Sequence, residues 1–556
     1  MTSFVERFLS NLEAHRERAF VVEVHASSGR LAPTRGALLR AMVEDARASL
    51  RARGVKPGDR VVLVAPNSTR WVAMDLAILA EGATAVPLYA RQAAREVADM
   101  IRDADPVLVI VGEPGLDTAL AEAGVEKRVL LDALFEGRRL DPQPPAALAA
   151  DHVVTIIYTS GSSGEPKGVM LTRANVEHMM PVLDTKLREL AGVAGGSDRV
   201  FHYLPFCFAG SRMVLWACLF RANGIHLSMR LEELVRELPL ATPEYFLNVP
   251  ALLDRVRAGV EKKLAEQPLP IRALYARAME ADRKERAGAA GKRDLAVLAL
   301  ADRTIFPRIR AQIGPALKGL VCGSAPLSLE TQAWFERIGL PIFQVYGLTE
   351  TTAIVTIDRK DAVQLGRVGH AIPGCEMRLG EGGELQIRGP NVFPGYFRRE
   401  AATREAFTAD GWFRTGDQCE IDGRGSLKII GRTKNVLVPS SGHNVAPEPL
   451  EERIRAAIPG CDHVLVVGHG RPFLSAILSG AAIQPSLVEE QLEAVNEGLP
   501  HYRRIRKFVV AREPFSPENG MLTANQKLRR AEIERRHASE LAAIYASAHG
   551  AGAEAR

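Results

Sequence analysis

The sequence predicts an α/β fold with a large N-terminal domain built from two α/β sheet layers and a small β-rich subdomain, followed by a small α+β C-terminal domain. With 556 residues the chain is too long for one hydrophobic core. From Asp59 onward, short apolar runs such as "DRVVLVAP" and "TAVPLY" alternate with helical patterns. This alternation is typical of βαβ units in a mostly parallel sheet. The same alternation of strand-like and helical segments begins again after Asp151, which predicts the second layer.

The later part of the chain differs from the two layers in its composition and in the spacing of its glycines and prolines. An Ala/Arg/Glu-rich stretch between about Glu261 and Arg310 is helical in pattern, and we interpret its many charges as a solvated helical face. From Gly366 the glycines and prolines are closely spaced, as in short antiparallel strands joined by turns. We place a boundary near Gly431, giving an N-terminal domain of residues 1–431 and a C-terminal domain of residues 432–556.

Composition excludes several classes of protein. The net charge of +5 is too small to indicate nucleic-acid binding. The six cysteines are scattered without a CxxC pair, which favours free thiols in the cytoplasm over disulfides or zinc. The N-terminal segment is charged and amphipathic, unlike a signal peptide. The longest apolar runs are shorter than the roughly 20 residues of a transmembrane helix. Peripheral membrane contact stays open.

A Gly/Ser-rich loop follows the strand-like "HVVTIIYT", in the segment "YTSGSSGEPKGVMLT" from Tyr158 to Thr172. Its spacing does not fit the GxxxxGK[ST] phosphate loop. Glycine nevertheless lets backbone N–H groups surround an anion, and hydroxyls and a lysine add donors. A flexible surface turn is the alternative. The candidate phosphate-binding residues are Thr159, Ser160, Gly161, Ser162, Ser163, Gly164 and Lys167.

This segment resembles the phosphate loop of the adenylate-forming superfamily, which includes acyl-CoA synthetases, luciferases and peptide-synthetase adenylation domains. Further motifs follow in the order that the resemblance requires, and together they cover about residues 51–530. They are "GSAPL" (Gly323–Leu327), "YGLTETT" (Tyr346–Thr352), "GWFRTGD" (Gly411–Asp417), "GRTKNVLVPSSGHNVAPEPLE" (Gly431–Glu451) and "PENGMLTANQKLRR" (Pro517–Arg530).

The resemblance implies roles for these residues in binding ATP. Tyr346 would stack on adenine. Thr349 would donate to a phosphate, and Glu350 would be a ligand of Mg²⁺. Asp417 would accept the ribose hydroxyls, and Arg432 would donate to the ribose. The remaining nucleotide-binding candidates are Gly323, Ser324, Ala325 and Gly347.

Members of the superfamily run two half-reactions, with a mobile C-terminal domain that moves between them. A carboxylic acid and ATP first give acyl-AMP and pyrophosphate, and a thiol, commonly that of CoA, then attacks the acyl-AMP. Lys527 would stabilise the charge that develops in the first step. Lys434 matches the hinge position. Ser441 and Gly442 would lie beside the pantetheine arm of CoA.

Long-chain acyl-CoA synthetases are the branch that this chain resembles most, through the helical insert, "PSSGHNVAPEPLE" and "ENGMLTANQKLRR". The chain departs from that pattern twice. Asn435 follows the hinge where an acidic residue is common, and Phe208 stands where long-chain relatives have a gate histidine. The second departure weakens the prediction of an ordinary long-chain acid. Five apolar residues either line an acyl tunnel or belong to the core, namely Leu204, Phe206, Met213, Trp216 and Leu219.

Two other functions stay open. An acyl-AMP ligase, or a ligase that loads a phosphopantetheinyl carrier protein, would act on a non-standard or aromatic acid, although the insertion typical of acyl-AMP ligases is absent between Val445 and Asp462. A non-catalytic nucleotide sensor would be expected to lose Lys527, Glu350 or Asp417, and all three are present.

Overall fold

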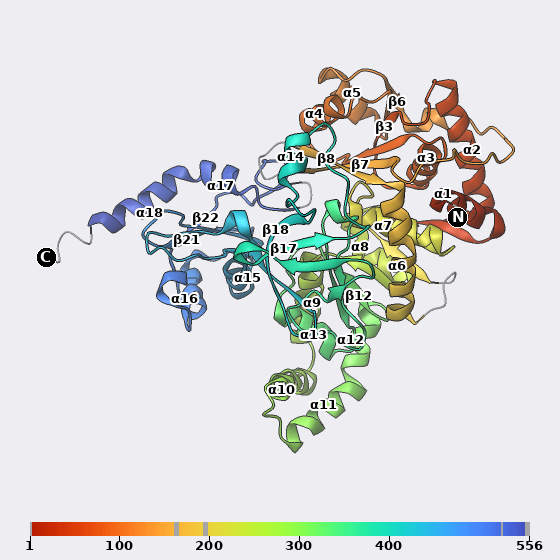
Figure 1. Cartoon of the computed structure of the whole chain (residues 1–556). Coiled ribbons are helices and arrows are strands. Elements are labelled where there is room, and N and C mark those ends of the chain that lie inside the picture. Colours follow the sequence, from red (N-terminus) through yellow and green to blue (C-terminus); the bar gives the residue numbers. More distant parts are fainter. Residues whose placement is uncertain (1–2, 161–165, 193–197, 524–525, 551–556) are drawn as a thin grey trace.

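We describe a computed structural model of the chain, covering residues 3–160, 166–192, 198–523 and 526–550. The structure consists of two sheet layers, a β-rich subdomain and a C-terminal domain (Figure 1). This arrangement confirms the predicted fold class. It also shows that the first strand of the chain belongs to the second layer, which the sequence pattern did not predict.

The first layer is a six-stranded sheet with the order β6-β5-β3-β4-β7-β8. All neighbours are parallel except β7 and β8, which form an antiparallel hairpin. Along β3, Val61 and Leu63 face one hydrophobic cluster and Val62 and Val64 face another, so both faces of the sheet are buried. The strands are β3 (Arg60–Val64), β4 (Thr84–Leu88), β5 (Leu108–Val111), β6 (Arg128–Leu130), β7 (Val153–Ser160) and β8 (Pro166–Thr172).

The second layer is a nine-stranded sheet with the order β15-β14-β13-β12-β11-β9-β10-β1-β2. Its central strands are parallel, and β2, β14 and β15 are antiparallel to their neighbours. The strands are β1 (Ala19–His25), β2 (Arg30–Arg35), β9 (Arg199–His202), β10 (Gly224–Ser228), β11 (Tyr245–Asn248), β12 (Leu320–Cys322), β13 (Ile342–Tyr346), β14 (Thr356–Ile357) and β15 (His370–Ala371).

Two smaller sheets complete the structure. The Gly/Pro-rich segment forms an antiparallel four-stranded sheet, as predicted. The C-terminal domain holds a mixed three-stranded sheet. The strands are β16 (Glu376–Leu379), β17 (Glu384–Arg388), β18 (Phe413–Ile421) and β19 (Leu427–Arg432), then β20 (His463–Val467), β21 (Leu474–Ser479) and β22 (Ile505–Val510).

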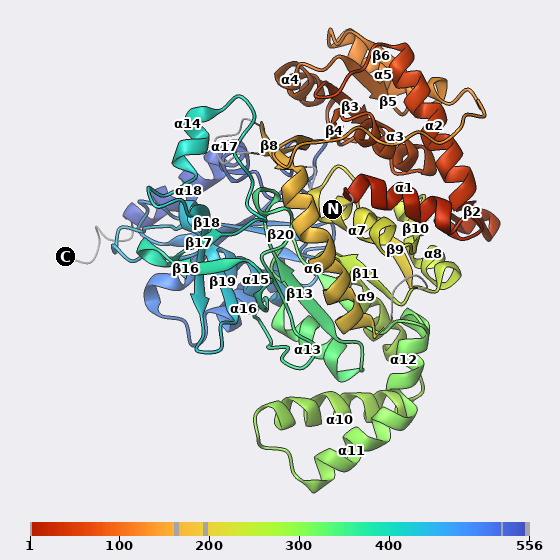
Figure 2. The same ribbon diagram turned by 45° about the vertical axis from the view of Figure 1, so that its right-hand side comes forward.

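Helices cover the sheets, and one pair stands apart from them. The helices α10 and α11 form an arm that projects away from the body of the molecule (Figure 2), and their exposed charges agree with the predicted solvated face. The helices of the large domain are α1 (Phe4–Ala14), α2 (Gly36–Ala52), α3 (Thr69–Ala80), α4 (Ala94–Ala104), α5 (Pro114–Glu122), α6 (Arg173–Ala191), α7 (Ala209–Phe220), α8 (Leu234–Ala241), α9 (Pro250–Ala265), α10 (Leu269–Arg286), α11 (Lys292–Thr304), α12 (Phe306–Ile313), α13 (Leu329–Arg337) and α14 (Glu400–Glu405). Those of the C-terminal domain are α15 (Glu448–Ala457), α16 (Pro485–Asn496), α17 (Arg530–Arg536) and α18 (Ala538–Gly550).

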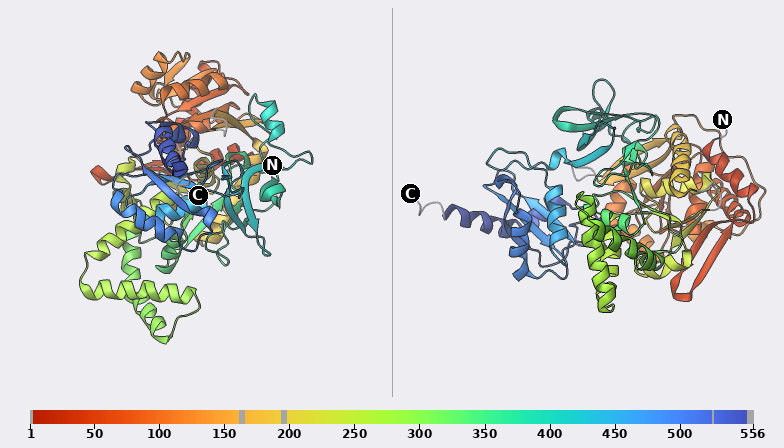
Figure 3. Two further views of the ribbon diagram at one scale, coloured as in Figure 1. Left: turned by 90° about the vertical axis from the view of Figure 1, so that its left-hand side faces the viewer. Right: turned by 90° about the horizontal axis from the view of Figure 1, so that it is seen from below.

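The C-terminal domain lies to one side of the large domain (Figure 3). Its two hydrophobic clusters contain only residues from Leu437 onward, and the other clusters end before Arg432. In the described residues, therefore, no hydrophobic cluster crosses from one domain to the other. All six cysteines are buried free thiols. Within the described residues, no helix is both long and apolar enough to cross a membrane.

Candidate active site

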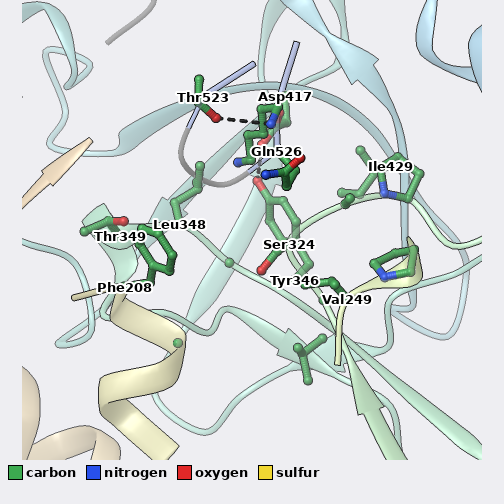
Figure 4. A pocket seen from close by; sticks show the side chains of 18 of the residues that line it. Phe208, Val249, Ser324, Tyr346, Leu348, Thr349, Asp417, Ile429, Thr523 and Gln526 are labelled. Carbon is green, nitrogen blue, oxygen red and sulfur yellow. Dashed lines mark hydrogen bonds between the residues drawn. The ribbon is translucent and has the colours of Figure 1, made fainter. Parts of the chain in front are cut away.

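A cavity of about 3280 Å³ opens where the two sheet layers, the β-rich subdomain and the C-terminal domain meet. In Figure 4, Tyr346 and Ser324 lie at its centre, Asp417, Thr523 and Gln526 above them, and Phe208, Leu348 and Thr349 together on one side. The predicted site residues that line it are Phe208, Thr159, Lys167, Gly323, Ser324, Ala325, Tyr346, Gly347, Thr349, Glu350, Asp417, Arg432, Lys434 and Lys527.

A buried carboxylate organises the centre of the cavity. Asp417, on β18, is 4% exposed. Its Oδ1 pairs with Nε of Arg432 at 2.8 Å, and its Oδ2 accepts a hydrogen bond from the Tyr346 hydroxyl at 2.6 Å. Burial raises the pKa of Asp417, while the Arg432 guanidinium and the hydrogen bond from Tyr346 oppose the rise. The Tyr346 ring is therefore held in place by the same carboxylate that is predicted to accept the ribose.

The loops around Tyr346 adopt conformations that few side chains tolerate. Ser324, Thr352 and Ala353 have φ values of +75°, +52° and +80°, in the left-handed region that costs a non-glycine residue energy. A Cβ on Gly347 would lie 2.1 Å from the carbonyl oxygen of Ala353, so only glycine fits there. Such strain concentrates at functional sites.

Tyr396 is a residue of this site that the motifs did not predict. Its hydroxyl donates to Oε1 of Glu350 at 2.9 Å, and the Lys167 Nζ lies 5.2 Å from the centre of its ring. Burial and the Glu350 carboxylate raise the pKa of Tyr396. It lies in "NVFPGYF", a turn-rich stretch without a chemical signature, so no local pattern marks it as a site residue.

Lys527 projects into the cavity from the C-terminal domain. It closes a tight hairpin in which its carbonyl accepts from the backbone N–H of Thr523 at 2.8 Å and its own N–H donates to the Thr523 hydroxyl at 3.1 Å. Enclosure by the cavity walls lowers the pKa of Lys527, the Arg432 charge acts in the same direction, and Asp417 and Glu350 oppose both. The side chain itself stays accessible to water in the cavity.

Comparison with known families settles the membership of the chain. Residues 36–397 match the family described as "AMP-binding enzyme", and residues 434–549 match "AMP-binding enzyme C-terminal domain". The chain belongs to the AMP-binding enzyme family. This is the adenylate-forming superfamily that the motifs resemble.

Individual relatives of this AMP-binding enzyme carry more specific names. A protein of Mycobacterium bovis named long-chain-fatty-acid–CoA ligase FadD15 is 32% identical over 541 residues, covering 88% of this chain and 89% of its own. A chloroplast protein of Arabidopsis thaliana named long-chain-fatty-acid–[acyl-carrier-protein] ligase AEE15 is 25% identical, covering 89% and 80%. The adenylation domain of a Mycobacterium chelonae carboxylate reductase superposes with a TM-score of 0.76 at 23% identity, covering 98% of this chain and 91% of that one. That structure shows the shared fold.

The predicted phosphate-binding loop of this AMP-binding enzyme is described only at its two ends. Thr159 pairs with Lys167 across the β7–β8 hairpin, and both line the cavity. The loop thus begins and ends at the predicted site. Gly161, Ser162, Ser163, Gly164 and the side chain of Ser160 lie outside the described residues.

The cavity also has an apolar side. Phe208 precedes α7 and packs on Tyr89, with ring centres 5.7 Å apart. Of the five apolar residues that the sequence left between an acyl tunnel and the core, Leu204 and Met213 line the cavity, whereas the other three belong to the core and do not line it. Those three are Phe206, Trp216 and Leu219. Further apolar lining comes from Leu183, Leu187, Val214, Leu234, Leu247 and Leu252.

The predicted hinge and CoA residues occupy different places. Lys434 lies in the 3₁₀ turn Thr433–Asn435, just beyond β19, and lines the cavity. Ser441 and Gly442 lie in an exposed loop outside its lining, where the neighbouring His443 stacks on Tyr502 at 4.0 Å. Gly442 has a φ of +77°, and a Cβ there would meet no atom within 4 Å.

Proposed function

We propose that this enzyme activates a fatty acid with ATP to give acyl-AMP and pyrophosphate, and then transfers the acyl group to the thiol of CoA. The observation that carries the proposal is the meeting of Lys527, Asp417 and Glu350 around one cavity that also has an apolar side. The relative named as a long-chain-fatty-acid–CoA ligase supports the same substrates.

ATP would bind with its adenosine at the centre of the cavity. The Tyr346 ring offers a flat surface to adenine. Asp417 would accept the ribose hydroxyls with the lone pairs that Arg432 and Tyr346 leave unused, since a carboxylate can accept about four hydrogen bonds. From this position the phosphates would reach toward Thr349 and Lys167, which line the same cavity.

In the first half-reaction, an oxygen of the acid attacks the α-phosphorus and the bond to the β-phosphate breaks, releasing pyrophosphate. Negative charge accumulates on the α-phosphate in the transition state. Lys527, a cation without a carboxylate partner of its own in the described residues, is suited to stabilise that charge. The apolar side of the cavity would hold the hydrocarbon tail of the acid.

The residues present fit a magnesium ion bound mainly through ATP. Glu350 accepts from Tyr396 with one carboxylate oxygen, which leaves the other for a cation. The described residues contain no cluster of three or more His, Cys, Asp or Glu that could hold a metal alone. Mg²⁺ commonly uses one or two carboxylates together with substrate phosphates, and when bound it would neutralise phosphate charge.

In the second half-reaction, the thiol sulfur attacks the acyl carbonyl, the thiol loses its proton and AMP leaves. Ser441 and Gly442 lie outside the lining of the cavity, so we propose that rotation about Lys434 brings their loop to it. Loop residues at the end of an element commonly absorb such a rotation.

The six free thiols fit a reducing compartment such as the cytoplasm.

A second acceptor has specific support. The Arabidopsis relative is named as a ligase for an acyl-carrier protein, whose phosphopantetheine presents the same thiol as CoA. We retain a carrier protein as the alternative acceptor.

A screen of acids tests the proposal. Fatty acids of graded length and aromatic acids are incubated with ATP and Mg²⁺, with CoA, a phosphopantetheinyl carrier protein or neither, and the products are identified by mass. We expect acyl-CoA from a fatty acid. Acyl-AMP that accumulates despite CoA, or thioester only on the carrier protein, would favour the alternative. No pyrophosphate release with any acid would contradict both.

A further inference from the structure

The hairpin that carries Lys527 is joined to the large domain by a partly exposed ion pair. Arg529, two residues beyond the lysine, pairs through Nη2 with Oε1 and Oε2 of Glu96 at 2.9 and 3.2 Å. Glu96 lies on α4 and is itself oriented by Gln92, whose amide donates to it at 2.7 Å. The backbone N–H of Arg529 also donates to Met521, so the ion pair is tied to the base of the hairpin.

A second contact joins the C-terminal domain to the other sheet layer. Arg455, on α15, donates through Nη2 to Oδ2 of Asp254 on α9 at 2.8 Å. Asp254 is held by the Thr331 hydroxyl at 2.6 Å, and Arg455 by Glu452 at 2.9 Å. Each partner of this ion pair is thus fixed from within its own domain.

Apart from the pair that Arg432 makes at the boundary itself, these are the two ion pairs that cross between the domains in the described part of the chain. They reach different layers, since α4 covers the six-stranded sheet and α9 packs with the second layer. Two separated contacts fix an orientation, whereas one contact would act as a pivot. Because no hydrophobic cluster of the described residues spans the domains, little apolar packing opposes their separation.

We propose that Glu96 and Asp254 are positioning residues that clamp the C-terminal domain in the orientation in which Lys527 enters the cavity. The inference rests on the proposed function, because the clamp serves the adenylation half-reaction and must open for the thioester step. Partly exposed ion pairs are weak and screened by salt. Weak contacts suit a clamp that has to release once in each catalytic cycle.

The two half-reactions are measured separately on Glu96→Gln, Asp254→Asn and the double variant. Adenylation is followed as acid-dependent exchange of pyrophosphate into ATP, and thioester formation as CoA-dependent consumption of supplied acyl-AMP. We expect each single change to slow adenylation about two- to fivefold, the range that an exposed ion pair corresponds to. Thioester formation should stay the same or rise. Asp410→Asn, which breaks an exposed pair with Arg378 inside the β-rich subdomain, should change neither rate.

Exchange of the charges provides the rescue. Arg529→Glu should slow adenylation as Glu96→Gln does, and Glu96→Arg combined with Arg529→Glu should restore most of the rate. Equal loss in both half-reactions, or no recovery in the exchanged pair, would overturn the clamp. If the wild-type protein forms acyl-AMP with none of the acids tested, the proposed function itself is refuted. The failure of the clamp and the failure of the proposed function are therefore distinguishable.

Discussion

Lys527 is the residue whose proposed role is tested most directly, because the two half-reactions can be assayed apart. Lys527→Ala removes a cation that reaches the cavity but supports no core packing. We expect adenylation to fall about 100-fold or more, the usual effect of removing a preorganised transition-state donor. Thioester formation from supplied acyl-AMP should persist. The exposed Lys318→Ala is the control, and equal losses in both steps would refute the assignment.

The protonation of Asp417 predicts how ATP binding depends on pH. Burial raises the pKa of this carboxyl, so on acidification it takes up a proton at a higher pH than an exposed aspartate, whose pKa is about 3.9. The protonated form is a weaker acceptor for the ribose, and the KM for ATP should therefore rise as pH falls through the raised pKa. Asp417→Asn removes the titration of this side chain, whereas the titration of ATP itself affects both proteins. Parallel pH profiles for the two proteins would contradict the prediction.

Motifs located most of the candidate residues but not their partners. Tyr346, Asp417 and Lys527 carry chemistry that their motifs identify, and the structure brings all three to one cavity. Tyr396 and Glu96 could not be predicted in this way. Each acts through a contact with a residue far along the chain, at separations of 46 and 433 residues, and no local pattern records such a contact.

At the scale of the element, the "YGLTETT" segment needs a residue without a side chain at its second position. A Cβ on Gly347 would lie 2.1 Å from the oxygen and 2.6 Å from the carbon of the Ala353 carbonyl, and backbone atoms cannot turn aside. Gly347→Ala should lower the free energy of unfolding by about 1–3 kcal/mol, as overpacking does, and should raise the KM for ATP by displacing Tyr346.

A glycine with free space around it supplies the control for that change. Gly259 lies within α9, and a Cβ there meets no atom within 4 Å. Gly259→Ala should leave the KM for ATP unchanged and stabilise the fold by about 0.4–1 kcal/mol. Urea unfolding and ATP titration measure both variants, and similar behaviour of the two would show that the chain rearranges to relieve the clash at Gly347.

The elements themselves were predictable where their pattern is local. The parallel strands β3, β4 and β5 follow from short apolar runs with helices between them, and the antiparallel sheet β16–β19 from closely spaced turns. The placement of β1 beside β10 was not predictable. About 200 residues separate the paired positions Val21 and Ile225, and the order of strands in a sheet depends on such long-range pairing.

At the scale of the whole molecule, the separate hydrophobic clusters predict that the large domain folds by itself. Its clusters contain residues up to Ile429, and those of the C-terminal domain begin at Leu437. Residues 1–433 expressed alone should therefore unfold cooperatively and bind AMP, because Tyr346 and Asp417 both remain, yet form no acyl-AMP without Lys527. Calorimetry and AMP titration measure the fragment beside full-length Lys527→Ala. If the fragment aggregates or fails to bind AMP while the full-length variant binds it, then the C-terminal domain is needed to complete the nucleotide site and not only to bring the lysine to it.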